Sequence, residues 1–595
     1  MFGTDVLPPV TVIAPRPNPF SSRAEFGHTA SLDATLAIRY PSITQLLQTF
    51  PGVTLRQWGS EGHWTTVQIR GASSKQVGVQ VDAIGLLSPS GIVDLSELPL
   101  PLFGRLTVLR GTHADKKTGH GFGGVVAFDT AQVDTPQFFT RYGSFGTIQG
   151  GMSAPFVLAT GQLNLSVAGL HSNGDFYFIN NQNTPANPND DVYQPLANND
   201  VTSWHGRAQY RLTGENPADF QLWGSLIDNG LAGSVGRLTS RTRLAVNRYR
   251  AQSTWHPDAA STGILYFENR RQAYSDPEGE FFGAPYSSTQ GMFQVGGSYC
   301  LLMIGEGLPL QTNLGVGVIT LDDAQFGYPS RLSLETTMQA EHLWEDATLS
   351  VRVNLGYHSD VGMRPSGALG LWMPLSETLA FKGNLSTAIR LPTFSEKYSQ
   401  YALFRANPSL RPESALEADG GLVWDAVGWT WEAAYFSRWM TDLIETTVVS
   451  VWIQSQNVSA AHVQGLELSG TTTWGPLHGS VNAIIQQGKV LTAGNNYGAP
   501  LRDFPPAKIA LQTRYVLSPQ WSAYSDVTWT SERPISFYEA LPSQTQVDLN
   551  LVWQPQPTQL IGLSVRNLFD DRAQDQYGFP LPGRSVSVQS SWTLS

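Results

Sequence analysis

The chain has 595 residues, of which 14% are charged and 11% are aromatic, and its formal net charge is -11. An acidic chain with 37 dispersed Lys and Arg residues lacks the basic face that a phosphate backbone requires, which excludes a general nucleic-acid binder. No run of about 18 apolar residues occurs, which excludes a helical membrane protein. Low charge, 57 Gly residues and short alternating segments instead favour a transmembrane β-barrel.

Residues 1–35 form a polar, proline-rich segment that we expect to be an extended periplasmic arm, because proline is excluded from helix interiors and from central strands. One run within this arm is prone to form a β-strand and consists of Leu7, Pro8, Pro9, Val10, Thr11, Val12, Ile13 and Ala14. Such a run can add to the edge of a partner's sheet. On composition alone, disorder is the competing interpretation.

The sequence pattern of residues 36–133 predicts a compact α+β domain. A short helix is expected at 42–48, with Ser42 as its N-cap and Pro51-Gly52 beyond its end. Short β-prone runs follow at 53–56, 66–70, 77–81, 106–110 and 124–128. About 100 residues is an ordinary size for a single domain.

Residues 134–595 repeat one pattern, in which apolar residues alternate with polar ones over about ten positions. Leu163, Leu165 and Val167 illustrate the alternation. Short turns alternate with longer polar loops, and the length predicts about 22 strands. The predicted fold class is therefore an all-β transmembrane barrel of about 22 antiparallel strands, whose lumen is wide enough to hold the N-terminal α+β domain as a plug.

Many segments occur in the order typical of one known family. In the predicted plug they are 43–53, 69–71, 79–82, 94–96, 108–111 and 121–125. In the predicted barrel they are 228–233, 388–396, 407–413, 463–467 and 566–570. These segments resemble the TonB-dependent outer-membrane receptors, and within that family the vitamin B12 receptor branch.

The resemblance implies active import of a scarce, large solute across the bacterial outer membrane, with energy supplied by TonB of the inner-membrane TonB–ExbB–ExbD complex. By position, Leu7 to Ala14 resembles the family's TonB box. Cobalamin is the first expectation for the cargo, and a ferric siderophore is the alternative. We expect a monomer embedded in outer-membrane lipid, with no catalytic residues and no required cofactor.

The resemblance also implies ion pairs that hold the plug in the barrel. Arg70 and Arg110, each before a Gly, resemble plug arginines that pair with two barrel acids. The expected acids are Glu467 and Asp419, with Glu417 as a rival of Asp419 on the same strand face. Charge-assisted hydrogen bonds of this kind are strong.

Acidic residues in the expected extracellular loops suggest a calcium site. The candidates are Asp190, Asp191, Asp200 and Asp228. Carboxylate oxygens on flexible loops suit Ca²⁺, and members of the vitamin B12 receptor branch use calcium to order their loops. Ordinary solvated loop acids are the competing interpretation.

Two other classes of protein share some of these features. A passive porin or an adhesin barrel is one alternative, although a porin needs neither a plug nor a TonB box. A secreted β-rich enzyme is the other, but low charge and aromatic-rich alternating strands disfavour it. The sequence contains no GxSxG, HExxH or P-loop motif, so we expect no enzymatic activity.

Overall fold

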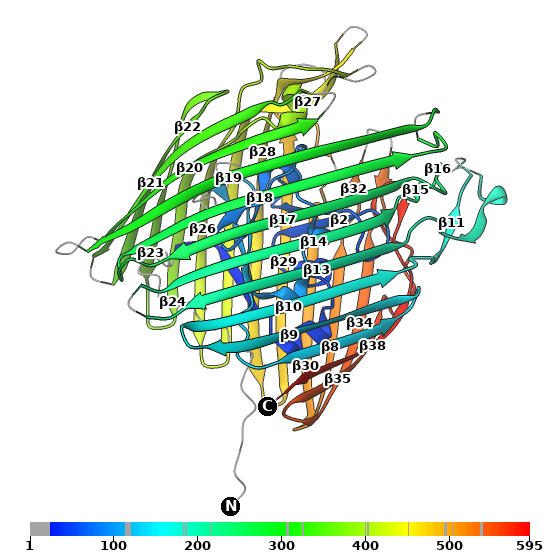
Figure 1. Ribbon diagram of the computed structural model, residues 1–595, viewed down its shortest axis with the longest axis horizontal. Helices are drawn as coiled ribbons and strands as arrows, with labels where there is room; N and C mark the ends of the chain where they lie inside the picture. Colours follow the sequence, from blue (N-terminus) through cyan, green and yellow to red (C-terminus); the bar gives the residue numbers. More distant parts are fainter. Residues whose placement is uncertain are drawn as a thin grey trace, which may run out of the picture.

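The computed structural model shows a closed antiparallel barrel that surrounds a smaller N-terminal domain, drawn in blue inside it (Figure 1). The barrel has 22 strands and one short additional strand, as the sequence predicts. The structure describes residues 24–112, 121–182, 184, 187–214, 216–281, 283–304, 309–323, 327–344, 346–398, 400, 404–449, 452–492, 497–502, 504–535 and 539–594.

The N-terminal domain, or plug, contains a five-stranded sheet in the order β1-β6-β7-β4-β5 and a separate hairpin of β2 and β3. Strands β4 and β7 run parallel, and their neighbours pair antiparallel. The strands are β1 (Gly27–Ser31), β2 (Val53–Gln57), β3 (Thr65–Ile69), β4 (Val77–Val81), β5 (Ile84–Gly85), β6 (Phe103–Arg110) and β7 (Gly124–Thr130). The five strands predicted in this domain are therefore confirmed.

Two short helices precede the hairpin: α1 (Ala34–Arg39) and α2 (Ile43–Leu47). The carboxylate of Asp33 accepts a hydrogen bond from the Leu36 amide at 2.7 Å, and the Ser42 hydroxyl caps α2. The predicted helix at 42–48 and its cap are confirmed, whereas α1 was not predicted. The described part of the plug then contains the 3-10 turns η1 (Ser74–Gln76), η2 (Leu95–Glu97) and η3 (Leu100–Leu102).

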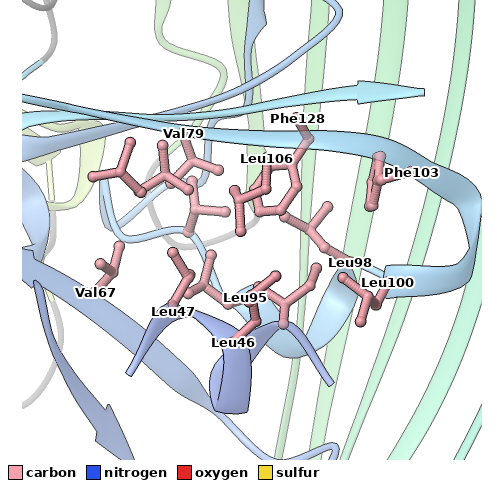
Figure 2. Packing of buried hydrophobic residues seen from close by; sticks show 14 of the residues in the cluster. Leu46, Leu47, Val67, Val79, Leu95, Leu98, Leu100, Phe103, Leu106 and Phe128 are labelled. Carbon is pink, nitrogen blue, oxygen red and sulfur yellow. The ribbon is translucent and has the colours of Figure 1, made fainter. Parts of the chain in front are cut away.

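The plug has its own hydrophobic core. In Figure 2, Leu46 and Leu47 of α2 lie opposite Leu106 and Phe128 of the sheet. Among the described residues, Trp223 is the one barrel residue that joins this core cluster. Most apolar side chains of the plug thus pack on one another, and smaller clusters around Phe122, Ile38 and Leu87 pack on the barrel wall.

The barrel strands are long and pair with their sequence neighbours, and the final strand closes on the first. They are β8 (Gln137–Gly143), β9 (Thr147–Leu158), β10 (Gly161–Ser172), β13 (Val201–Leu212), β14 (Ala218–Gly230), β17 (Arg243–Trp255), β18 (Ser261–Asp276), β19 (Tyr286–Ile304), β20 (Pro309–Asp323), β21 (Ser330–Trp344), β22 (Ala347–His358), β23 (Gly362–Pro374), β24 (Leu379–Arg390), β26 (Glu413–Ala426), β27 (Trp429–Val449), β28 (Trp452–Trp474), β29 (Leu477–Val490), β30 (Ala507–Ser518), β31 (Trp521–Thr530), β34 (Gln544–Gln556), β35 (Gln559–Arg566) and β38 (Ser585–Thr593).

Alternation along each strand separates a lipid face from a lumen face. On β10, Leu165 and Val167 are exposed on the outside, whereas Asn164 and Ser166 are buried inside the barrel. Near the ends of the strands, exposed Trp side chains mark the expected membrane interface. These include Trp344, Trp429, Trp474 and Trp521. This pattern fits a protein of the bacterial outer membrane.

The two ends of the barrel differ. At the end that holds the C-terminus, connections such as 159–160 and 427–428 have two residues. The opposite end has longer connections, several of which contain their own short elements, and is the extracellular end by this asymmetry. Those elements are β11 (Tyr177–Asn180), η5 (Pro188–Asp190), β12 (Val192–Pro195), β15 (Gly233–Ser234), β16 (Arg237–Leu238), α3 (Phe394–Tyr398), β25 (Phe404–Arg405), β32 (Arg533–Pro534), β33 (Ala540–Leu541), β36 (Gln574–Gln576) and β37 (Phe579–Pro580).

The folded plug begins earlier than the predicted boundary at residue 35. Strand β1 pairs with β6, from Gly27 opposite Leu109 to Ser31 opposite Arg105. This pairing satisfies backbone groups that an arm would leave to water, and it places 27–31 in the plug rather than in the arm. The predicted TonB box, Leu7 to Ala14, lies outside the described residues. No helix in the described part of the chain is long and apolar enough to cross a membrane.

Candidate functional site

The plug meets the barrel wall at a buried cluster of charges around Arg70. Arg70 follows β3 and has a φ of +50°, and the next residue, Gly71, has a φ of +68°. A left-handed backbone at a residue with a long side chain is strained and needs support from its surroundings. Here the support is the hydrogen bond from the Arg70 amide to the Gly52 carbonyl, 3.0 Å, together with the contacts of its guanidinium.

The Arg70 guanidinium binds three carboxylates of the barrel wall. Its Nε donates to Glu467 Oε1 at 3.1 Å, and its Nη2 donates to Glu467 Oε2 at 2.7 Å. Its Nη1 donates to Glu417 Oε1 at 2.9 Å and also to Asp419. Burial alone lowers the pKa of Arg70, but the three carboxylates outweigh it and raise the pKa well above its ordinary value. Arg70 therefore stays protonated, and three buried carboxylates of the barrel wall hold its guanidinium in place.

Arg110, at the end of β6, extends the same network. Its Nη1 donates to Glu467 Oε2 at 2.8 Å, so Glu467 binds both plug arginines. Its Nη2 donates to Glu432 Oε1, also at 2.8 Å. The Thr112 amide donates to Glu417 Oε2 at 3.0 Å, which ties the backbone beyond Arg110 to the same wall.

Two cations of the barrel complete the network. The Nε of Arg438 donates to Glu417 Oε2 at 2.9 Å, and its Nη atoms lie 3.4 Å from the carbonyl oxygens of Arg70 and Gly123. Lys382 pairs with Glu432. We call this set the acidic-wall cluster, which consists of Arg70, Arg110, Lys382 and Arg438 with Glu417, Asp419, Glu432 and Glu467.

The structure brings together the four residues predicted to join plug and barrel: Arg70, Arg110, Asp419 and Glu467. It does not choose between Asp419 and Glu417, because Arg70 contacts both. The period of two along β26 puts these acids on one face and is the signal that predicts a shared role. Sequence reasoning missed Glu432, Lys382 and Arg438, whose relevance depends on which strands lie side by side.

Gly52 is required where the plug backbone passes closest to the cluster. Its φ is +68°, and a Cβ atom at this position would collide with Glu467 Oε1. The predicted Pro51-Gly52 helix stop therefore has a second purpose. It allows the Glu467 carboxylate to reach both Arg70 and Arg110.

A second charged cluster joins the plug to the wall at β17 and β18. Glu97 of η2 is buried between Arg248 and Arg270, whose Nη2 atoms lie 2.7 Å and 2.6 Å from its carboxylate oxygens. Glu268 on β18 also pairs with Arg248. The signs are reversed relative to the acidic-wall cluster, because here the plug supplies the anion. No motif in the sequence pointed to this cluster.

Single ion pairs attach the plug elsewhere around the barrel. The shortest contacts are Arg39–Asp526 at 2.9 Å, Glu61–Arg141 at 2.7 Å and Lys75–Glu396 at 3.0 Å. The plug is thus bound on several sides by charged groups, in addition to the smaller apolar clusters at the wall.

Some of the spaces between plug and wall are small. Three cavities of about 130, 100 and 80 Å³ lie along this boundary. A drug-sized ligand needs a cavity of roughly 300 Å³ or more. None of the three is therefore a path for a large solute while the plug is in this position.

The four acids predicted to bind calcium do not form an oxygen cage in this arrangement. Arg243 donates to Asp200 at 2.9 Å and also pairs with Asp228. Asp190 accepts a hydrogen bond from the Thr184 hydroxyl at 2.7 Å. The described residues contain no group of three or more His, Cys, Asp or Glu side chains that could hold a metal ion. The four acids therefore do not fit a calcium ion while Arg243 holds two of them.

Two family models match this chain. The model described as "TonB-dependent Receptor Plug Domain" matches residues 33–125. The model described as "TonB dependent receptor-like, beta-barrel" matches residues 111–568, which is well over half of the chain.

Individual proteins resemble the chain more distantly. It is 22% identical over 449 residues to "Vitamin B12 transporter BtuB" of Vibrio vulnificus (strain CMCP6), covering 73% of this chain and 70% of the relative. The siderophore receptor PirA of Acinetobacter baumannii is 14% identical, with a TM-score of 0.79 over 96% of this chain and 98% of its own. The FrpB iron transporter of Neisseria meningitidis is 11% identical, with a TM-score of 0.80 over 96% of this chain and 99% of its own. At these identities the solved structures show a shared fold.

Proposed function

Since the chain belongs to the TonB-dependent receptor family and is a TonB-dependent transporter of the outer membrane, we propose that its cargo is cobalamin, imported against a gradient. The observation that supports energised import is the way the plug is bound. The plug has an apolar core that is largely its own, and many of its attachments to the wall are buried ion pairs. A domain with its own core can stay folded when it shifts as a unit.

Energy has to come from outside this chain. The outer membrane has neither ATP nor an ion gradient, so work must be delivered from the inner-membrane TonB–ExbB–ExbD complex. In this proposal TonB pairs with the strand-prone run from Leu7 to Ala14 and pulls on the plug. Displacing Arg70 and Arg110 from the wall acids then opens a passage along the lumen.

The cobalamin assignment is supported by the sequence relative that carries the vitamin B12 name, because its similarity extends over 73% of this chain. A ferric siderophore is the second candidate. It is supported by receptors such as PirA and the Pseudomonas aeruginosa ferric enterobactin receptor PfeA, whose structures match 96% of the chain.

Tryptophan fluorescence of the detergent-purified protein tests the choice, because the chain has 17 Trp residues. The protein is titrated with cyanocobalamin and, separately, with ferric enterobactin. Saturable sub-micromolar quenching by cyanocobalamin alone is the expected result. Quenching by the siderophore alone would overturn the cobalamin assignment and leave energised transport in place.

A further inference from the structure

Two arginines of the barrel wall face each other directly. Arg248 on β17 and Arg270 on β18 are partners in the antiparallel register, and both side chains are almost completely buried inside the barrel. Like charges directly opposite each other destabilise a strand pair. The pair of Glu268 with Arg248 offsets this repulsion only in part, because the barrel places two arginines beside one carboxylate here.

The plug offsets the remaining repulsion with one carboxylate. Arg248 donates to Glu97 Oε2 from Nε at 3.2 Å and from Nη2 at 2.7 Å. Arg270 donates to Oε1 from Nη2 at 2.6 Å and from Nε to both oxygens at 3.2 Å. Two guanidinium groups thus bind a single carboxylate through paired hydrogen bonds, which is the geometry by which proteins bind oxyanions.

The surrounding wall remains positive without the plug. Arg248, Arg250 and Arg270 contribute three positive charges, and Glu268 contributes one negative charge, which leaves a balance of +2. Arg250 also donates to a plug carbonyl, that of Val81, at 2.7 Å. When the plug shifts, these donors lose their plug partners and face the lumen.

The barrel wall at β26–β28 has a net charge of the opposite sign. Without the plug, the acidic-wall cluster keeps four carboxylates against two cations, which leaves -2. An anionic group in the opened lumen is therefore repelled by β26–β28 and attracted to β17 and β18. The distribution of charge on the wall therefore directs such a group along the side of the passage formed by β17 and β18.

We propose that Arg248 and Arg270 form an anion-binding subsite on the transport path, which the Glu97 carboxylate occupies while the plug is in place. When the plug moves, an oxyanion of the cargo takes the position of that carboxylate. This inference rests on the proposed function, since it requires a cargo that passes the plug. The phosphodiester of a corrinoid and the acidic oxygens of a ferric chelate share the required chemistry.

The subsite itself is tested without transport. Glu97→Ala removes the carboxylate and leaves space for acetate between Arg248 and Arg270. Thermal unfolding of the purified protein is measured in sodium acetate and in sodium chloride at equal ionic strength. We expect the variant to unfold at a lower temperature than the wild type and acetate to restore several degrees of the loss, with no comparable effect on the wild type.

Glu61→Ala is the matched control, because the Glu61 carboxylate pairs with one arginine, Arg141, instead of two. Acetate should stabilise this variant much less. Equal effects of acetate and chloride on Glu97→Ala would overturn the proposed subsite.

The role in transport is tested with Arg270→Gln, which removes one of the two donors and leaves Arg248 paired with Glu97. Uptake of radiolabelled cyanocobalamin and of ferric enterobactin is measured in energised cells, together with fluorescence binding. We expect a roughly tenfold loss of uptake for the cargo that binds, with unchanged binding. Arg211→Gln, near the periplasmic end of β13, should transport normally.

The outcomes separate the two proposals. Normal uptake by Arg270→Gln of the cargo that binds would overturn the transport role of the subsite. If the wild type takes up neither cargo in an energy-dependent way, the cargo assignment fails. The acetate experiment then still decides whether Arg248 and Arg270 bind an anion, which is the structural core of the inference. Loss of uptake of one cargo alone identifies which source supplies the oxyanion.

Discussion

Arg70 and Glu467 lie 397 residues apart in the chain and meet through two parallel hydrogen bonds, Nε to Oε1 at 3.1 Å and Nη2 to Oε2 at 2.7 Å. Arginine and a carboxylate pair best in this geometry. Because Arg70 belongs to the plug and Glu467 to β28, this one contact spans the boundary that must open during transport. The contact must therefore be strong enough to hold the plug in place and must also be able to break and form again.

Removing the Arg70 charge should loosen the plug. Arg70→Gln leaves three buried carboxylates short of one cation, and breaking a buried pair from one side costs about 3–5 kcal/mol. We expect roughly hundredfold faster hydrogen–deuterium exchange in β2 and β3. Arg105→Gln is the control, since its contact with Asp129 is long, 3.6 Å, and both side chains are substantially exposed. Equal exchange in the two variants would contradict the proposed importance of Arg70.

A methyl group at Gly52 should weaken the same contact from the backbone. Gly52→Ala combines a left-handed φ, which costs about 1–2 kcal/mol, with a collision against Glu467 Oε1. Gly362→Ala has a similar φ of +78° but meets open space. Both variants should lose stability in thermal unfolding, and Gly52→Ala should lose clearly more. A loss of the same size in both would show that only backbone strain matters.

Acid should remove the contribution of Glu97. Burial alone raises the pKa of Glu97, but Arg270 and Arg248 outweigh it and lower the pKa from 4.5 to about 2. A carboxyl group whose pKa is lower in the folded state stabilises the fold fully above pH 4.5, and this contribution is lost as the pH falls toward 2. It is on the order of 3 kcal/mol at neutral pH.

The difference in unfolding temperature between the wild type and Glu97→Gln should therefore be constant from pH 7 to about pH 5 and shrink at lower pH. Glu278→Gln is the control, because the ion pair of Glu278 with Arg241 is exposed on an extracellular loop. A difference that stays constant down to pH 2.5 would show that Glu97 is not held as a carboxylate.

Deleting residues 5–14 should separate binding from transport. The predicted TonB box lies in this stretch, so the variant should bind cargo at the extracellular side as the wild type does. Energised uptake in cells should fall to the level of cells that lack TonB. Unchanged uptake would instead favour passive permeation through the barrel.

Calcium, if it binds the loop acids, must compete with Arg243. We predict that Arg243→Ala raises calcium affinity at least tenfold, because it frees Asp200 and Asp228 from their cation. Isothermal titration with calcium chloride measures the change. Arg411→Ala, which breaks the exposed pair with Asp442 of β27, serves as the control. Equal affinities in both variants would exclude a site at Asp200 and Asp228.

Much of the fold follows from local sequence features. Ser42 and the spacing of Ile43, Leu46 and Leu47 predict α2, because capping and helical periodicity act over a few residues. Alternation of lipid-facing and lumen-facing residues predicts the strands, because side chains in a strand change face at every position. The position of Arg70 before Gly71 was recognisable through resemblance to the receptor family.

The sequence by itself thus determined a plugged barrel of about 22 strands and the arginines that face its wall. Only the tertiary structure decided which charges meet. Arg248 opposes Arg270 because of the register between β17 and β18, and Glu97 reaches them from a turn that lies 151 residues before Arg248 and 173 residues before Arg270. Arg243 likewise captures Asp200 and Asp228, which sequence reasoning assigned to calcium. The register of β17 and β18 depends on the geometry of the turn that joins them. The meeting of groups this far apart in the chain depends on the whole barrel closing around the plug.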